Sequence, residues 1–182
     1  MIPTRPVLLA LGLIVVLSTI AADQLFAANM RSFNEAVRRN AAVVLLGSVK
    51  EVSQLQRTRF DIKARALIQI SKVLRGPADS PSTATLEYSS FDEKTPMHEG
   101  GPQYELRPGD QVVLFAGSFA STIPPGYLIH GKREELRQRV EALRDNLKQM
   151  SAEQLKLNEI NEEDRRLQLA LYEKLCTFLQ TP

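Results

Sequence analysis

Residues 58–74, TRFDIKARALIQISKVL, alternate between apolar and polar side chains over most of their length. Asp61, Lys63 and Arg65 stand at odd positions, and only Leu67 interrupts the polar set before residue 73. The apolar residues at even positions are Phe60, Ile62, Ala64, Ala66, Ile68 and Ile70. A period of two predicts a β-strand with one buried face. The segment is longer than an ordinary flat strand, so we also expect a strong curl or a bulge.

Four further segments have the composition of strands: residues 41–52 (AAVVLLGSVKEV), 83–90 (TATLEYSS), 111–118 (QVVLFAGS) and 127–130. Gly47 lies inside the first, where glycine is costly unless a bulge or sharp bend requires it. Residues 75–82 and 123–126 are expected to be turns, residues 91–108 a polar surface loop, and residues 107–110 a tight turn. Five strands, one of them long and curled, predict a small closed β-barrel. Its expected core contains Val44, Leu46, Phe60, Ile62, Ile68, Ile70, Leu86, Val113 and Phe115.

Helices are predicted on both sides of the strands. Ser32 and Glu35 have the spacing of a capping box, which favours a short helix before the first strand. After residue 132 an a/d heptad seam begins, and Ser151 and Gln154 indicate a new helix start behind it. The seam consists of Leu136, Val140, Leu143, Leu147 and Met150, and a second apolar stripe consists of Leu167, Leu171, Leu175 and Phe178. We expect the two stripes to cover each other within one chain, with homodimerisation through residues 132–182 as the alternative.

The order of these segments resembles a known family. EAVRRNAAVVLLGSVKEV, RFDIKARALIQISKVLRGP, TATLEYSS and LRPGDQVVLFAGS together are similar to the netrin-like or TIMP-like OB-fold module, over about residues 32–131. The resemblance implies an OB-like barrel preceded by a short helix, and a protease-inhibitor-like binding protein as one alternative function. Metalloprotease inhibitors of this family use an N-terminal cysteine on the target metal. No cysteine occurs within residues 32–131, so the resemblance assigns no functional residue.

The N-terminus has the pattern of an export signal. Arg5 precedes the uncharged segment 7–20, VLLALGLIVVLSTI. As a helix this segment would rise about 21 Å, which is short of the ~30 Å hydrocarbon core and suits a signal peptide. Small residues allow cleavage after Ala22, Ala27 or Ala28. We therefore expect a periplasmic or secreted protein, with retention as a membrane anchor over residues 7–28 as the alternative.

No catalytic constellation is recognisable in the sequence. Neither His98 nor His130 lies in a known catalytic motif, and the adjacent Asp92 and Glu93 would point apart. His98 has acidic neighbours that include Glu99, but a structural metal site needs four matched ligands. We predict no catalytic residue, no metal site and no cofactor, and the pattern assigns no ligand-binding residue. The chain is expected not to be an enzyme, and an enzyme whose site is invisible to motifs is the alternative.

Composition narrows the class of partner. Twenty-three basic and 21 acidic side chains give a net charge of only +2, without the clustered basic face that nucleic-acid binding needs. The single cysteine, Cys176, is expected to be buried as a free thiol. We divide the chain into a signal peptide or anchor over residues 1–22, an α+β OB-like module over residues 29–131 and a helical tail over residues 132–182. The predicted function is an exported, non-catalytic binding or assembly module with a protein partner.

Overall fold

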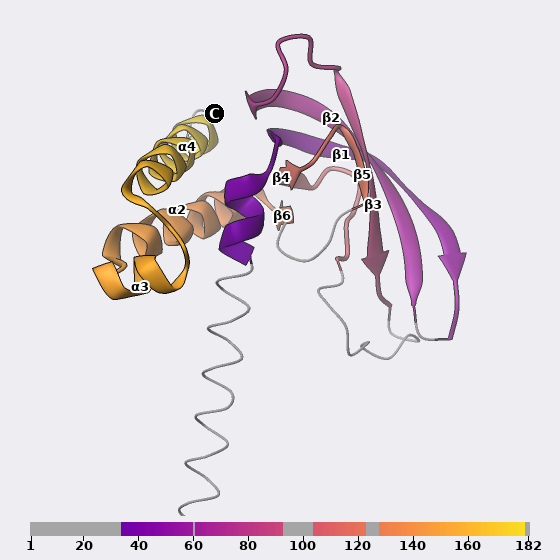
Figure 1. The fold of residues 1–182 in the computed structure, drawn as a ribbon. Helices are drawn as coiled ribbons and strands as arrows, with labels where there is room; N and C mark the ends of the chain where they lie inside the picture. Colours follow the sequence, from indigo (N-terminus) through magenta and orange to yellow (C-terminus); the bar gives the residue numbers. More distant parts are fainter. Residues whose placement is uncertain (1–33, 60, 93–103, 123–127, 181–182) are drawn as a thin grey trace, which may run out of the picture.

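The computed structural model describes residues 34–59, 61–92, 104–122 and 128–180. These residues form an α+β fold in which a sheet is preceded by a helix over residues 34–40 and followed by further helices (Figure 1). This confirms the predicted fold class and the predicted helices before and after the sheet. The elements are β1 (Val43–Arg57), β2 (Ile62–Arg75), β3 (Thr83–Ser90), β4 (Gln111–Ala116), β5 (Ala120–Thr122), β6 (Leu128–Gly131), α2 (Arg133–Gln149), α3 (Ala152–Leu157) and α4 (Glu162–Gln180).

The strands form one sheet in the order β5-β3-β2-β1-β4-β6. The five strands from β3 to β6 in this order pair antiparallel, and the short β5 runs parallel to β3. Within the described residues β5 and β6 occupy opposite edges and no pairing joins them, so the sheet is not closed. The five predicted strands correspond to β1, β2, β3, β4 and β6, and β5 was not predicted. The closure of the sheet into a barrel stays a prediction.

The pairing of β1 with β2 contains the bulges that the sequence predicts. The register between these strands shifts at four places along their length. Gly47 lies at one of the shifts, and a Cβ atom there would stand 2.5 Å from the carbonyl oxygen of Gln69 and 2.7 Å from Cγ2 of Ile68. Only glycine therefore fits this crossing of the two strands without a shift. β1 also extends to Arg57, beyond the predicted end at residue 52, because its polar half continues to pair with β2.

Burial along β2 confirms the predicted period of two. Ile62, Ala64, Ala66 and Ile68 are buried, whereas Lys63 and Arg65 are exposed. Ile70 is partly buried against the same cluster. Phe60, also predicted for the core, lies outside the described residues.

The prediction of one barrel core is wrong for β1 and β4. The first part of β1, from Val43 to Gly47, and most of β4 are buried on both faces, which explains why these stretches are continuous apolar runs. One face, with Val43, Leu45, Val112 and Leu114, joins Ile68 and Leu86 in the cluster on the concave side of the sheet. The opposite face packs under the helices and contains the predicted barrel residues Val44, Leu46, Val113 and Phe115.

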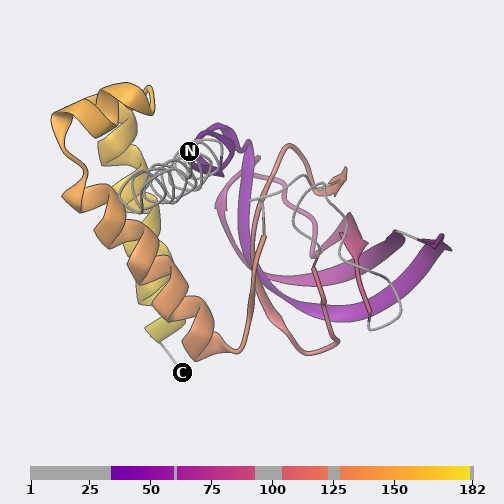
Figure 2. The same cartoon turned by 90° about the horizontal axis from the view of Figure 1, so that it is seen from below.

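The helices gather on one side of the sheet (Figure 2). α2 and α4 contribute to the same apolar cluster as the helix-facing side of β1 and β4. The predicted seam lies in this contact, with Leu136, Val140 and Leu147 buried. The predicted capping box begins α3, since Ser151 Oγ accepts from the backbone N–H of Gln154.

Two predictions about burial are wrong. Leu167 was expected on the buried stripe but is 53% exposed, because the buried face of α4 is centred on Gln168, Tyr172, Leu175 and Leu179. The segment 91–108 was expected to be a polar surface loop, but Tyr104 and Leu106 are buried in the concave cluster.

The remaining local predictions concern turns and the N-terminus. The tight turn at residues 107–110 is confirmed, because the backbone N–H of Asp110 donates to the carbonyl of Arg107 and Gly109 has a φ of +95°. Over the residues that the structure covers, no helix has the length and apolarity needed to cross a membrane. The export signal predicted over residues 1–22, like Ser32, lies outside the described residues.

Candidate functional site

A buried ionic ring joins the first described helix to the last. The Arg38 guanidinium donates to Oε2 of Glu35 at 2.8 Å through Nη2 and to the hydroxyl of Tyr172 at 3.2 Å through Nε. The Tyr172 hydroxyl in turn donates to Oε1 of Glu35 at 3.3 Å. Burial, followed by the charge of Glu35, raises the pKa of Tyr172 to about 12, so the hydroxyl keeps its proton at neutral pH. All three groups are thus used within the fold, and the predicted capping box of Ser32 and Glu35 stays a prediction because Ser32 lies outside the described residues.

Other arginines cap the carbonyl ends of helices. Arg39 donates to the carbonyls of Asn158 and Glu159 at the end of α3, and Arg165 donates to the carbonyl of Lys148 at the end of α2. A cation at the C-terminus of a helix offsets both the unpaired carbonyls and the helix dipole. The same contact is made by Arg75 with the carbonyls of Arg39 and Ala41, and by Arg133 with those of Phe178 and Leu179.

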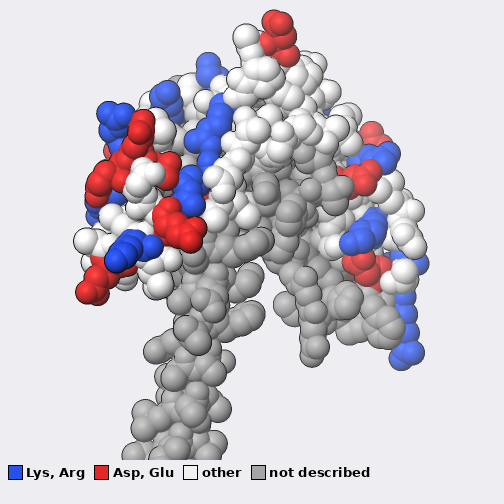
Figure 3. Space-filling view, in the orientation of Figure 1, with Lys and Arg blue, Asp and Glu red and all other residues white. Residues whose placement is uncertain are grey.

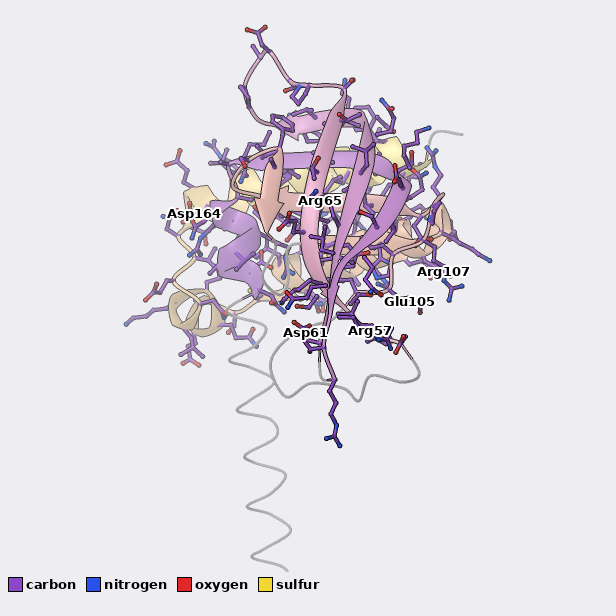
Figure 4. All side chains as sticks on the ribbon, turned by 90° about the vertical axis from the view of Figure 1, so that its right-hand side faces the viewer. Arg57, Asp61, Arg65, Glu105, Arg107 and Asp164 are labelled. Carbon is purple, nitrogen blue, oxygen red and sulfur yellow. The ribbon has the colours of Figure 1, made fainter. Side chains whose placement is uncertain are left out.

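The exposed face of the sheet carries ion pairs between neighbouring strands. Arg65 on β2 pairs with Glu87 on β3, and Arg57 pairs with Asp92 at 2.8 Å. Figure 4 shows Arg57 and Arg65 along this face, with Arg107 and Glu105 forming another pair nearby. On the helical side, Lys and Arg side chains also alternate with Asp and Glu (Figure 3). Each of these half-exposed ion pairs contributes little to the stability of the fold, and together they are typical of a solvated surface.

Tyr88, Tyr104, His130 and Asp110 come together at one end of the concave face. The rings of Tyr88 and Tyr104 are edge-to-face with centroids 6.4 Å apart, and those of Tyr104 and His130 are edge-to-face at 6.0 Å. Nδ1 of His130 lies 4.0 Å from the Asp110 carboxylate. Burial lowers the pKa of His130, although the charge of Asp110 opposes it, so the imidazole is neutral at pH 7.

This aromatic end has limited chemical capacity. A neutral imidazole can accept a proton, but 4.0 Å is too long for a hydrogen bond that would orient it through Asp110. The Tyr88 hydroxyl is buried and has no hydrogen-bond partner among the described residues, and burial together with the Asp110 charge raises its pKa to about 12. That hydroxyl is therefore a poor nucleophile at neutral pH.

Among the large apolar side chains that the structure describes, the most exposed lies at the corner between α3 and α4. Leu157, the last residue of α3, is 78% exposed. A shallow groove of about 410 Å³ lies on another face of the same corner, and its lining includes the buried side chains of Leu155 and Ile160. Lys156 and Glu159, both exposed, also line it. We call this surface, comprising Ala152, Leu155, Lys156, Leu157, Glu159, Ile160, Asn161 and Glu162, the α3–α4 corner.

The corner has the chemistry of a binding surface. Covering an exposed leucine or an apolar groove gains free energy when a partner removes it from water. These residues were not predicted from the sequence, although a signal was present. Leu155 and Leu157 are two positions apart, so one short helix cannot bury both on the same face.

The acidic and histidine residues that were considered for a metal or catalytic site do not form one in the described part of the structure. Asp92 is engaged by Arg57, while Glu93, His98 and Glu99 lie outside the described residues. Among the described residues, no group of three or more His, Cys, Asp or Glu side chains is placed to hold a metal ion. Cys176 is buried as a free thiol, as predicted, and burial raises its pKa.

Comparison with protein-family models and with curated proteins gave no match for this chain. The netrin-like or TIMP-like resemblance therefore stays a hypothesis, and function must be argued from the residues of this fold alone.

Proposed function

We propose that this chain is an exported, non-catalytic binding or assembly module whose helical tail carries a contact surface for protein. The observation that carries this proposal is the α3–α4 corner, where Leu157 is 78% exposed and a separate shallow groove has apolar lining residues. A partner that covers such a side chain gains the free energy of its burial. A protein partner fits this surface because its apolar centre is bordered by charged groups, as in an interface core with a polar rim.

The distribution of arginine supports a protein partner over a nucleic acid. Arg38, Arg39 and Arg75 are used inside the fold, and Arg57 and Arg65 pair with carboxylates. Binding to a phosphate backbone requires basic side chains gathered on one face and available to phosphate oxygens. The basic residues named here are instead engaged by carbonyls, a hydroxyl or carboxylates of the chain, which fits the small net charge of +2.

An OB-like barrel is proposed as the scaffold that presents the tail. Two features support it: β1 pairs antiparallel with both β2 and β4, and β3 pairs parallel with a strand that follows β4. Closure would require the β3 and β4 edges of the sheet to meet through β5 and β6. Nuclear Overhauser contacts between backbone protons of β5 and β6 would support closure, and their absence alongside strong β1–β4 contacts would contradict it.

Export is proposed from residues 1–28 alone, through the uncharged segment 7–20 and the small residues behind it. Intact-mass measurement on the protein recovered from its envelope fraction tests this. A mature chain that begins between Asp23 and Met30 is expected. A species that keeps residues 1–22 would favour the anchored alternative.

Binding through the tail is tested by affinity capture from the same envelope fraction. The bait chain is compared with Leu157→Ser and with the matched control Leu55→Ser, since Leu55 is 44% exposed on β1, away from the corner. We expect a stoichiometric protein partner that is lost with Leu157→Ser and kept with Leu55→Ser. Equal recovery with both variants would show that the corner does not carry binding.

A further inference from the structure

The second half of β1 is a strand edge with no neighbour among the described strands. β1 pairs with β4 only as far as Val49, whose N–H donates to the carbonyl of Asp110 and whose carbonyl accepts from the N–H of Gly109, each at 2.8 Å. β1 then continues to Arg57, and in the part of the chain that the structure describes, residues 50–56 pair with β2 alone. The cause is a difference in length, since β1 has 15 residues and β4 has six.

This open edge presents main-chain groups to solvent. Successive residues of a strand direct their N–H and C=O groups to opposite neighbours, so about half of these groups in residues 50–56 point away from β2. The side chains along the edge are exposed except that of Val52, which is partly buried. At about 3.3 Å per residue the edge is about 23 Å long, which suits a strand of ordinary length. A row of open donors and acceptors at this spacing is matched by another extended main chain.

The side chains of the edge define which sequence an added strand would have. Val52 packs against the concave cluster and stands opposite the buried Ala66 of β2. The next residue, Ser53, stands opposite the exposed Arg65. Side chains of an added strand would alternate in the same way, with one set beside Val52 at the border of the apolar cluster and the other set in solvent. The matching segment therefore alternates apolar and polar residues.

Two bulges favour a flexible segment over a second rigid sheet edge. The register of β1 against β2 shifts between Val49 and Glu51. It shifts again between Gln54 and Gln56. Bulges bend a strand and increase its twist, which hinders pairing between two preformed edges. An extended segment that orders on binding can follow the bend, because its own dihedral angles adjust to it.

We propose that residues 50–56 of β1 bind an extended segment of a partner protein, which adds to the sheet as a strand with its apolar residues on the concave side. In Figure 1 the end of β1 lies on the right of the sheet and α3 on the left. The surface is therefore separate from the α3–α4 corner, and the inference does not depend on the corner.

The probe is a library of random linear eight-residue peptides displayed on phage and selected on the purified full chain. Selected peptides are expected to alternate apolar and polar residues. Amide hydrogen exchange of the chain, followed by NMR, is expected to slow by at least about tenfold within residues 50–56 when the peptide is added, because open N–H groups become paired. The same peptide N-methylated at alternate residues lacks half of its donors and is expected to lose binding.

A matched pair of variants tests the edge from the side of the protein. Val52→Lys places a charge on the concave side, where an inward-pointing charge opposes strand addition, and is expected to weaken peptide binding by at least about tenfold. Ser53→Lys adds the same charge one residue further along, opposite the exposed Arg65, and is expected to bind as wild type does. Circular dichroism checks that both variants keep the fold, and the N-methylated peptide gives a test that leaves the chain unchanged.

Three results would overturn the inference: a library without binding peptides, bound peptides that leave the amides of residues 50–56 unprotected, or equal binding by Val52→Lys and Ser53→Lys. None of them bears on the α3–α4 corner, which the Leu157→Ser capture tests. The two proposals can therefore fail separately.

Discussion

The ionic ring of Glu35, Arg38 and Tyr172 allows a quantitative prediction about stability. Glu35 and Arg38 are 6% and 9% exposed, so either charge would be buried without compensation if the other were removed. Breaking a buried pair in this way costs about 3–5 kcal/mol. We therefore expect Arg38→Met to lower the free energy of unfolding by about 3–5 kcal/mol, because among the described residues the Glu35 carboxylate then keeps only the Tyr172 hydroxyl as a hydrogen-bond partner.

Tyr172→Phe is a milder perturbation of the same ring. It removes the hydrogen bonds of 3.2 and 3.3 Å but leaves the 2.8 Å contact between Arg38 and Glu35 in place. Because both lost bonds are long, we expect a cost of about 1–2 kcal/mol. Replacing both charged residues together, as Glu35→Leu with Arg38→Met, leaves no buried charge without a partner. That double variant is expected to cost much less than the sum of its single variants.

Urea unfolding followed by circular dichroism and by Tyr fluorescence measures these values. The m-value must stay constant across the variants for the free energies to be compared. Strict additivity of the two single charge replacements would refute the reasoning, because independent groups add and a coupled buried pair does not. A cost below about 0.5 kcal/mol for Arg38→Met, the level of ordinary surface substitutions, would likewise show that the ring is solvated in solution.

Three further predictions concern the sheet. Ile62→Ala should cost about 2–5 kcal/mol in urea unfolding, whereas Lys63→Ala should cost far less, since Ile62 is 6% exposed and Lys63 faces solvent; equal losses would contradict the face assignment. Gly47→Ala should cost about 1–3 kcal/mol in the same assay, because its Cβ would clash with the backbone of β2, and an unchanged midpoint would disprove that close approach. The pKa of His130 is lowered by burial, so the unfolded chain binds the proton more readily. The free energy of unfolding should therefore fall as the pH drops below about 6.5, the pKa of histidine in an unfolded chain. His130→Gln should reduce the change in the urea midpoint between about pH 7 and pH 5. An equal change in the wild-type protein and the variant would exclude His130 as the source.

The sheet was partly predictable because periodicity reports directly on burial. The alternation from Ile62 to Ile68 gave the correct buried face of β2, since this strand has one face in the core and one in water. The same reasoning fails for Val44 and Phe115, because strands buried on both faces have no alternation to read. Val44 and Phe115 face away from the concave cluster because α2 and α4, much later in the chain, provide a second apolar layer that covers them.

The candidate site was harder to predict because its contacts are long-range. Arg38 and Tyr172 are 134 positions apart, and nothing in a local pattern indicates that they meet. The α3–α4 corner was missed for the opposite reason. Its signal, Leu155 and Leu157 on one short helix, is local, but a spacing of two does not show which of the two leucines is exposed.

The position of helix 34–40 links the N-terminal segment to the helical tail. Arg38 bonds to Tyr172 on α4, Arg39 bonds to the carbonyl end of α3, and Arg75 bonds to the carbonyl end of helix 34–40 itself. This helix is therefore part of the folded core and not a spacer behind the proposed export signal. A mature chain beginning between Asp23 and Met30 would keep every one of these contacts. A chain shortened beyond residue 38 would leave the α4 side of the ring without its charged partners, and the tail that carries the α3–α4 corner would lose its support.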